Sequence, residues 1–219
     1  MLMRKLGKPV LLWVCCPLVA LASFRFLFGG VAETMPDFLY HAELRPLAFY
    51  SHIIVASVAL LLVPFQLWPG MRSRRIQLHR VLGRIYGISI LVGGISGLWL
   101  AVTTTSGITA SWGFALLAVV WVGATVIGIG SAIGGDVGAH QRWMIRSAAL
   151  TMAAVALRIY LGIGVVAGFR YEYIAGLLAW ICWVPNLIIA ELIIRKPTFF
   201  TKIPSTAQQV RQEPDVLQK

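Results

Sequence analysis

The chain has 219 residues, of which 58% are hydrophobic and only 12% are charged, and its mean hydropathy is +0.81. About 25% of the residues in an ordinary soluble domain are charged, so this composition excludes a soluble globular protein. The formal net charge is +11, but the basic residues flank long apolar runs. They therefore indicate orientation in a membrane and contact with anionic lipids, and we expect no nucleic-acid partner.

Long apolar segments recur along the whole chain. A membrane-spanning helix needs about 20 apolar residues, so these segments predict an all-α, polytopic transmembrane helical bundle in one domain, residues 1–200. About six spans are expected, at 9–28, 46–68, 82–103, 111–133, 147–169 and 173–194. The first is interpreted as a retained span, because no small-residue cleavage site ends its apolar run. Residues 201–219 are polar and are expected to form a disordered cytoplasmic tail.

The connecting loops alternate in charge, and this alternation predicts the orientation of the chain. Basic residues stand before the first span, between the second and third, before the fifth and after the sixth, whereas the other loops are acidic or uncharged. Because cytoplasmic loops carry the excess of Lys and Arg, both termini are expected in the cytoplasm. The expected location is the cytoplasmic (inner) membrane, crossed several times.

Two histidines stand in similar contexts at the cytoplasmic ends of spans. His79 begins the string HRVLGRIY, and His140 begins HQRWMIR; in each string two arginines follow the histidine. This weak internal repeat places both imidazoles at a similar depth. A haem b held between two histidines needs that arrangement on facing helices, so the pair predicts a haem site, with His79 and His140 as metal ligands only if haem iron is bound.

Four arginines accompany these histidines and could bind the haem propionates, helped by the positive ends of two helix dipoles. They are Arg80, Arg84, Arg142 and Arg146. The same group would also suit an anionic phospholipid or solute. A third interpretation is that these residues only anchor the loops on the cytoplasmic side.

A second polar layer is expected in the outer half of the membrane. Arg158 lies about 18 Å into the fifth span, and His52 is predicted at nearly the same depth in the second. Charged residues inside a membrane mark functional sites by default. Tyr50 and Tyr160 belong to the same layer, which could hold a quinone, a haem propionate or a proton relay. The alternative is that Arg158 bonds to backbone carbonyls and Tyr160 and only fixes the bundle. His41, in the outer loop, is expected to be solvated.

The two histidine strings, followed by Leu157 and Arg158, resemble a bacterial family of predicted membrane proteins, domain-of-unknown-function family 2306, over roughly 49–163. That resemblance implies a polytopic membrane protein and no particular activity. The chain is also loosely similar to cytochrome b561-type helical bundles. It lacks their second pair of intramembrane histidines, so this similarity implies one haem rather than two.

Three hypotheses about function remain open. The first is a haem b-binding or quinone-linked redox protein. The second is a non-redox transporter or a protein that binds anionic lipids or solutes, although no span carries an acidic residue near its middle, which disfavours an ion-coupled transporter. The third is a structural subunit, which predicts a membrane partner. A homodimer through the glycine-rich third or fourth span is a further hypothesis, and no catalytic residue is identified.

Overall fold

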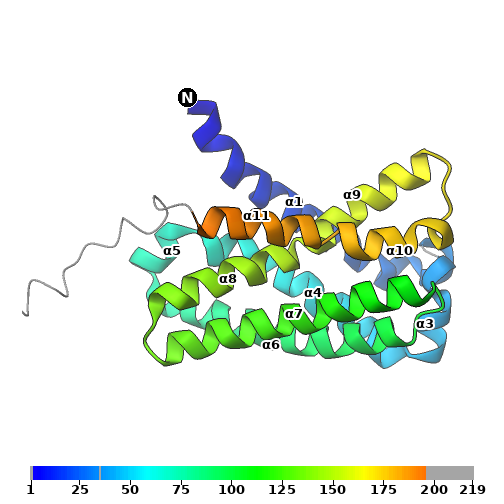
Figure 1. Cartoon of the computed structure of the whole chain (residues 1–219), viewed down its shortest axis with the longest axis horizontal. Helices are drawn as coiled ribbons and strands as arrows, with labels where there is room; N and C mark the ends of the chain where they lie inside the picture. The colour runs from blue at the N-terminus through cyan, green and yellow to red at the C-terminus, as the bar shows by residue number, and fades with distance from the viewer. Residues whose placement is uncertain (1, 35, 196–219) are drawn as a thin grey trace, which may run out of the picture.

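The computed structural model describes residues 2–34 and 36–195, and every regular element within them is helical (Figure 1). The predicted all-α class is therefore confirmed. The helices are α1 Leu2–Gly29, α2 Val31–Thr34, the 3-10 turn η1 Pro36–Phe38, α3 Leu39–Leu44, α4 Pro46–Leu67, α5 Pro69–Arg74, α6 Ile76–Val102, α7 Ile108–Ile133, α8 Val137–Thr151, α9 Ala153–Val166, α10 Tyr171–Ile181 and α11 Val184–Ile194. The tail expected at 201–219 lies outside the described residues.

Six helical segments of the described chain are long and apolar enough to cross a membrane. They are Leu12–Gly29, Pro46–Leu67, Ile76–Val102, Ile108–Ile133, Val137–Val166 and Tyr171–Ile194. Their number agrees with the prediction from the sequence. The third and fifth begin earlier than expected, so His79 and His140 lie within helices α6 and α8 rather than before them.

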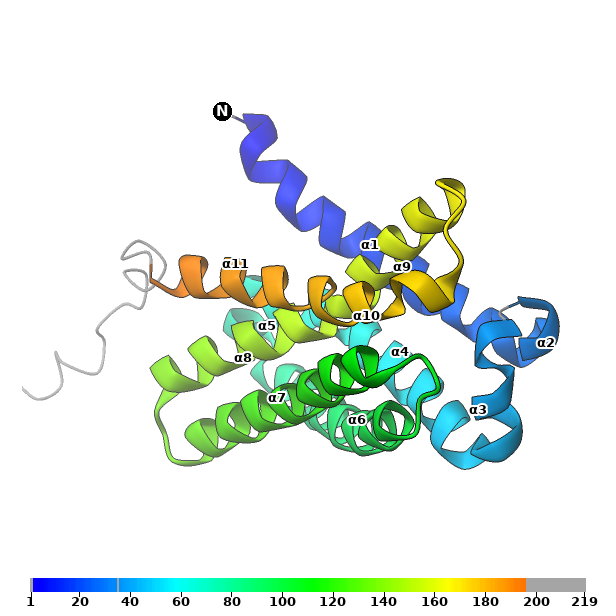
Figure 2. The ribbon, with the colours of Figure 1, turned by 45° about the vertical axis from the view of Figure 1, so that its right-hand side comes forward.

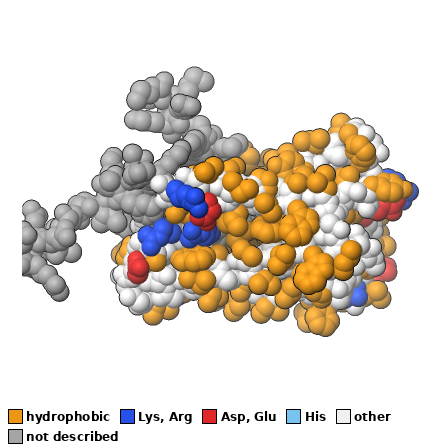
Figure 3. All heavy atoms as spheres, in the orientation of Figure 1, with side chains coloured by type: hydrophobic (Ala, Val, Ile, Leu, Met, Phe, Trp, Pro, Cys, Tyr) orange, Lys and Arg blue, Asp and Glu red, His pale blue; other side chains and the backbone are white. Residues whose placement is uncertain are grey.

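The surface has the character expected of a protein surrounded by lipid. Hydrophobic side chains cover the middle of the face drawn in Figure 3, and the charged side chains gather toward the two ends of the long axis. Many large apolar residues are exposed, including Leu18, Ile95, Trp112 and Leu177. Exposure of this extent is costly in water and favourable in hydrocarbon, which supports insertion across a bilayer.

Four helices form the core of the bundle. α4 packs on α6, α6 on α7 and α7 on α8, and contacts between α4 and α8 close the ring. Short turns join α6 to α7 and α7 to α8, so α6 and α8 run in the same direction on opposite corners of this ring. The remaining spans pack on its outside: α1 on α4, α10 on α7 and α11 on α8. Figure 2 shows the beginning of α1 and the end of α9 projecting away from the core.

The last two spans are each broken near the middle. The fifth is divided at Met152, between α8 and α9, and the sixth at Cys182 and Trp183, between α10 and α11. Pro185 opens α11 and cannot donate a backbone hydrogen bond. Asn186 compensates, because its Nδ2 donates to the carbonyls of Cys182 at 3.1 Å and Ala149 at 3.3 Å. The break therefore leaves a polar tie between α11 and α8.

A short helical cap, made of α2, η1 and α3, covers the end of the bundle where α6 ends and α7 begins. Tyr40 anchors it: its hydroxyl donates to Thr104 Oγ1 at 3.2 Å and accepts from the amide of Thr105 at 2.9 Å. The expectation that His41 is solvated is wrong, because this side chain is 5% exposed and its Nε2 lies 2.6 Å from the Tyr40 hydroxyl. Burial and the nearby charge of Arg45 lower the pKa of His41 to about 4.

Candidate functional site

A buried hydrogen-bond network crosses the centre of the four-helix core. The hydroxyl of Tyr86, on α6, lies 3.0 Å from Ser147 Oγ and 2.9 Å from Thr151 Oγ1, both on α8. Trp121, on α7, donates from Nε1 to Thr151 Oγ1 at 2.9 Å, and Thr125 Oγ1 lies 2.7 Å from Ser147 Oγ. All five side chains are buried. The network therefore fixes the relative positions of α6, α7 and α8.

This network also fixes the register between the two histidine strings. His79 is seven residues before Tyr86, and His140 is seven residues before Ser147. Seven residues are about two helical turns, so each histidine lies on the same face of its helix as the residue that enters the network, about 10 Å nearer the helix start. Because Tyr86 and Ser147 meet and α6 runs parallel to α8, we expect His79 and His140 to lie on facing sides of the two helices at a similar depth.

The nitrogen atoms of these two histidines differ in their partners. His140 Nδ1 lies 2.8 Å from the carbonyl oxygen of Gly128, on α7. A carbonyl only accepts, so Nδ1 carries the proton and Nε2 presents a lone pair. His79 Nδ1 is buried without a hydrogen-bond partner. His140 lies close enough to His79 for a charge on His140 to act on the His79 imidazole.

Metal chemistry in this part of the chain would need ligands from outside the protein. Among the described residues, no three His, Cys, Asp or Glu side chains gather as a metal site. Two imidazoles alone satisfy a metal poorly, but they complete the coordination of an iron that already has a porphyrin. The donor set of His79 and His140 thus fits haem iron better than a bare ion.

The structure divides the four arginines expected at this site. Arg146 donates to both carboxylate oxygens of Glu191, on α11, at 2.5 and 3.0 Å, and its guanidinium lies 4.5 Å above the ring of Trp143. This pairing occupies Arg146 within the protein. Arg84 is exposed and lines an apolar groove of about 330 Å³ between α6 and α7. Arg80 is exposed next to His79, and Arg142 is half-buried on the first turns of α8.

Two further polar residues lie near the start of α6 and were not assigned to this site from the sequence, Arg72 near His79 and Gln66 near Gly83. Arg72, on α5, lies within electrostatic range of His79, and burial lowers the pKa of Arg72 from its ordinary value. Gln66, near the end of α4, has a buried Nε2 without a hydrogen-bond partner, and its Oε1 lies 3.5 Å from the position of a Cβ built on Gly83. The sequence offered one indication for each residue. Arg72 stands in a run of basic residues, and Gln66 is the single amide side chain of its span.

The predicted outer layer brings His52 and Arg158 into one region. His52 Nδ1 lies 2.8 Å from the carbonyl oxygen of Gly93, on α6, and its ring packs against Gly97, where a Cβ would come within 2.9 Å. Arg158 lies close enough for its charge to act on this imidazole. Its Nη1 donates to Ala154 O at 3.0 Å, and its Nη2 donates to Ser23 Oγ, on α1.

The two tyrosines assigned to that layer make other contacts. The Tyr50 ring lies edge-on to Phe49, with centroids 5.4 Å apart. Tyr160 packs against the outer cluster around Tyr171, on α10. Neither hydroxyl makes a hydrogen bond within the described residues. The alternative interpretation expected Arg158 to bond to backbone carbonyls and to Tyr160; the structure has the bond to the carbonyl of Ala154, and Ser23 takes the place of Tyr160.

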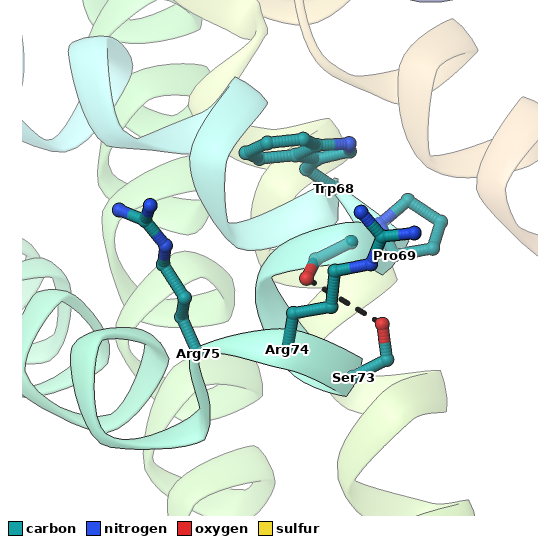
Figure 4. Close-up of a pocket in the computed structure, with 6 residues that line it drawn as sticks. Trp68, Pro69, Ser73, Arg74 and Arg75 are labelled. Carbon is teal, nitrogen blue, oxygen red and sulfur yellow. Dashed lines mark hydrogen bonds between the residues drawn. The ribbon is translucent and has the colours of Figure 1, made fainter.

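A separate hollow of about 560 Å³ lies at the turn between α4 and α5 (Figure 4). Its lining includes Trp68, Ser73, Arg74 and Arg75. Figure 4 shows the two guanidinium groups extending on either side of the turn, with the Trp68 indole above it. Tryptophan and arginine together are typical of the interface between hydrocarbon and anionic headgroups.

Comparison with known proteins identifies the chain at the level of a family. No curated protein and no solved structure matches it. The family model described as "Predicted membrane protein (DUF2306)" matches residues 49–194, a range that includes His52, His79, His140 and Arg158. This match covers more than half of the chain, which therefore belongs to the DUF2306 family of predicted membrane proteins.

Proposed function

We propose that this protein is a membrane haem b protein that carries electrons, with His79 and His140 as the two axial ligands of the iron. The observation that carries the proposal is the contact between Tyr86 and Ser147, 3.0 Å apart. His79 and His140 each stand seven residues before this contact on parallel helices, which supports an arrangement with the two imidazoles opposite one another. Facing imidazoles at one depth inside a helical bundle are the arrangement that two axial ligands require.

The condition of the imidazoles also supports ligation. A histidine that binds a metal through one nitrogen commonly donates the proton of the other to a carbonyl, which fixes the ring and its tautomer. His140 already has this arrangement with Gly128. The buried Nδ1 of His79 has no acceptor or donor among the described residues, and a buried polar atom without a partner is costly. A bound group or an ordered water is expected beside it.

Cations for the haem propionates lie on the same side of the bundle. Arg72, Arg80 and Arg142 are the arginines that we assign to this role. Arg146 is omitted because Glu191 already neutralises it, and Arg84 because it faces the groove between α6 and α7. The first turns of α6 and α8 add the partial positive charge of two helix starts.

An absorption spectrum of the full chain tests the proposal. The protein is expressed with an added haem precursor, purified in detergent, and measured oxidised and after reduction with dithionite. A Soret band with sharp bands in the reduced state is expected. The single variants His79→Ala and His140→Ala are each expected to lose the low-spin spectrum, and His41→Gln is the matched control that retains it.

Folding is checked for every variant by gel filtration and circular dichroism, because a misfolded bundle would also be colourless. A colourless wild-type protein under full haem supply would refute the proposal. So would a folded His79→Ala, His140→Ala double variant that keeps an unchanged low-spin spectrum.

A further inference from the structure

The outer half of the bundle contains a positive charge, Arg158, that has no ion-pair partner within the described residues. Arg158 belongs to α9, in the fifth span, and its hydrogen-bond acceptors are a carbonyl oxygen and a hydroxyl, both neutral. The ion pairs among the described residues are Arg146 with Glu191 and Arg170 with Glu172, and neither includes Arg158. Arg25, on α1, adds a second charge close enough to act on Arg158. A charged arginine inside the membrane carries a free-energy cost, which hydrogen bonds to the oxygens of a ligand would offset.

His52 supplies the complementary chemistry. Its Nδ1 must carry the proton, because the carbonyl oxygen of Gly93, 2.8 Å away, can only accept. The ring is held in place from α6, since Gly97 leaves space for it that a methyl group would fill. Nε2 therefore presents a fixed lone pair and makes no hydrogen bond within the part of the chain that the structure describes. It can accept a proton donor from a ligand.

We infer that His52 and Arg158 bind the headgroup of a lipid-soluble quinone or quinol. The Arg158 guanidinium donates to a ring carbonyl or hydroxyl oxygen, and His52 Nε2 accepts a hydrogen bond from a ring hydroxyl. Both groups lie on membrane-spanning segments, so the ligand must dissolve in hydrocarbon. A quinol combines an apolar tail with oxygens that both donate and accept. This binding site is distinct from the histidine pair near the starts of α6 and α8, and it does not depend on haem being bound there.

A phospholipid is the main competing ligand. Its phosphate diester would pair well with the Arg158 guanidinium, but the diester carries no proton to donate to His52 Nε2, so a phospholipid would need a second group, a headgroup hydroxyl or ammonium, at the same depth. If Arg158 had a purely structural role, His52 Nε2 would likewise have no donor to bond with. The combination of a fixed acceptor and an intramembrane cation favours the quinol.

The test measures binding of decyl-ubiquinone and of a short-chain menaquinone analogue, each in oxidised and reduced form, to the full chain in nanodiscs of zwitterionic lipid. Quenching of tryptophan fluorescence gives the dissociation constant. Arg158→Gln is expected to weaken binding of both forms at least about tenfold, the loss of one hydrogen bond to a charged partner, and His52→Leu is expected to weaken binding of the reduced form by a similar factor, because only the quinol has a hydroxyl to donate. Arg146→Gln, which lies on the same span but outside the site, is expected to bind like the wild-type protein.

Each outcome decides the inference. Saturable binding to the wild type that Arg158→Gln weakens for both forms and His52→Leu weakens for the reduced form supports it, and the His79→Ala, His140→Ala double variant is expected to retain that binding, so failure of the haem proposal leaves this one standing. The inference is overturned if none of the four compounds shows saturable binding to the wild-type protein. Equal binding by folded Arg158→Gln also overturns it, and so does tight retention of an anionic phospholipid that no quinone displaces.

Discussion

Tyr86 and Ser147 meet across the diagonal of the four-helix core, with 3.0 Å between the Tyr86 hydroxyl and Ser147 Oγ. Helices α6 and α8 lie at opposite corners of the ring of α4, α6, α7 and α8, so they are not neighbours in it. The hydrogen bond between Tyr86 and Ser147 therefore links two helices that do not pack directly side by side. Each of His79 and His140 precedes this contact by seven residues. The proposed haem site two turns away therefore depends on a bond at the middle of the bundle.

Removing the Tyr86 hydroxyl should weaken this link without emptying the core. Tyr86→Phe is expected to lower the free energy of unfolding by about 1 kcal/mol, because Ser147 and Thr151 keep other partners. Unfolding in detergent, followed by circular dichroism, measures the change. Tyr50→Phe is the control, since its hydroxyl has no hydrogen bond within the described residues. Equal effects of the two variants would contradict a stabilising role for the network.

Glycine has opposite roles at two positions of α7. A Cβ on Gly113 would lie 2.9 Å from the backbone oxygen of Ala179, on α10, whereas a Cβ on Gly123 would meet nothing within 4 Å. Gly113→Ala should therefore force α7 and α10 apart and cost about 1–3 kcal/mol. Gly123→Ala should be neutral or stabilise by up to about 1 kcal/mol through helix propensity. Thermal unfolding in detergent compares them, and a Gly113→Ala protein as stable as Gly123→Ala would refute the close approach.

The ion pair between Arg146 and Glu191 ties α8 to α11, with side chains 20% and 33% exposed. Glu191→Gln should destabilise the protein more than the double variant Arg146→Gln, Glu191→Gln, because the single change leaves an uncompensated charge between helices. A double-mutant cycle of unfolding free energies should give a coupling of about 0.5–3 kcal/mol. A coupling near zero would show that the two charges are screened from one another.

The sequence was sufficient to predict the spans, since long apolar runs follow directly from the thickness of the bilayer. The similar depth of His79 and His140 stays a prediction, made from two similar strings at the ends of spans.

Other features depended on which helices meet, and hydropathy contains no such information. The partner of Arg146 is Glu191, 45 residues later, and nothing local distinguishes it from the other arginines. Burial of His41 required the loop at Thr104 to fold over Tyr40. Arg72 seemed to be one of many loop arginines until α5 placed it beside His79.

The burial of His41 makes stability depend on pH. Its pKa is about 4 in the folded protein, below the ordinary value of about 6.5, so the unfolded chain binds more protons between these values. The stability that neutral His41 contributes is therefore lost as the pH falls from about 6.5 toward 4. Thermal unfolding of the wild type minus that of His41→Gln isolates this effect from nearby carboxylates. A difference that is constant over this range would contradict it.

The hollow beside Trp68 is expected to hold an anionic headgroup of the lipid leaflet. Arg74 and Arg75 line it, and each arginine near an anionic surface contributes about 1 kcal/mol to lipid binding. Phosphatidylglycerol should therefore raise the melting temperature more than phosphatidylcholine does, and less at high salt, which screens exposed charges. Arg74→Gln with Arg75→Gln should remove most of that difference, whereas Arg170→Gln, an exposed arginine paired with Glu172, should preserve it. If the Arg74, Arg75 double variant still responds fully to phosphatidylglycerol, the headgroup binds elsewhere on the protein.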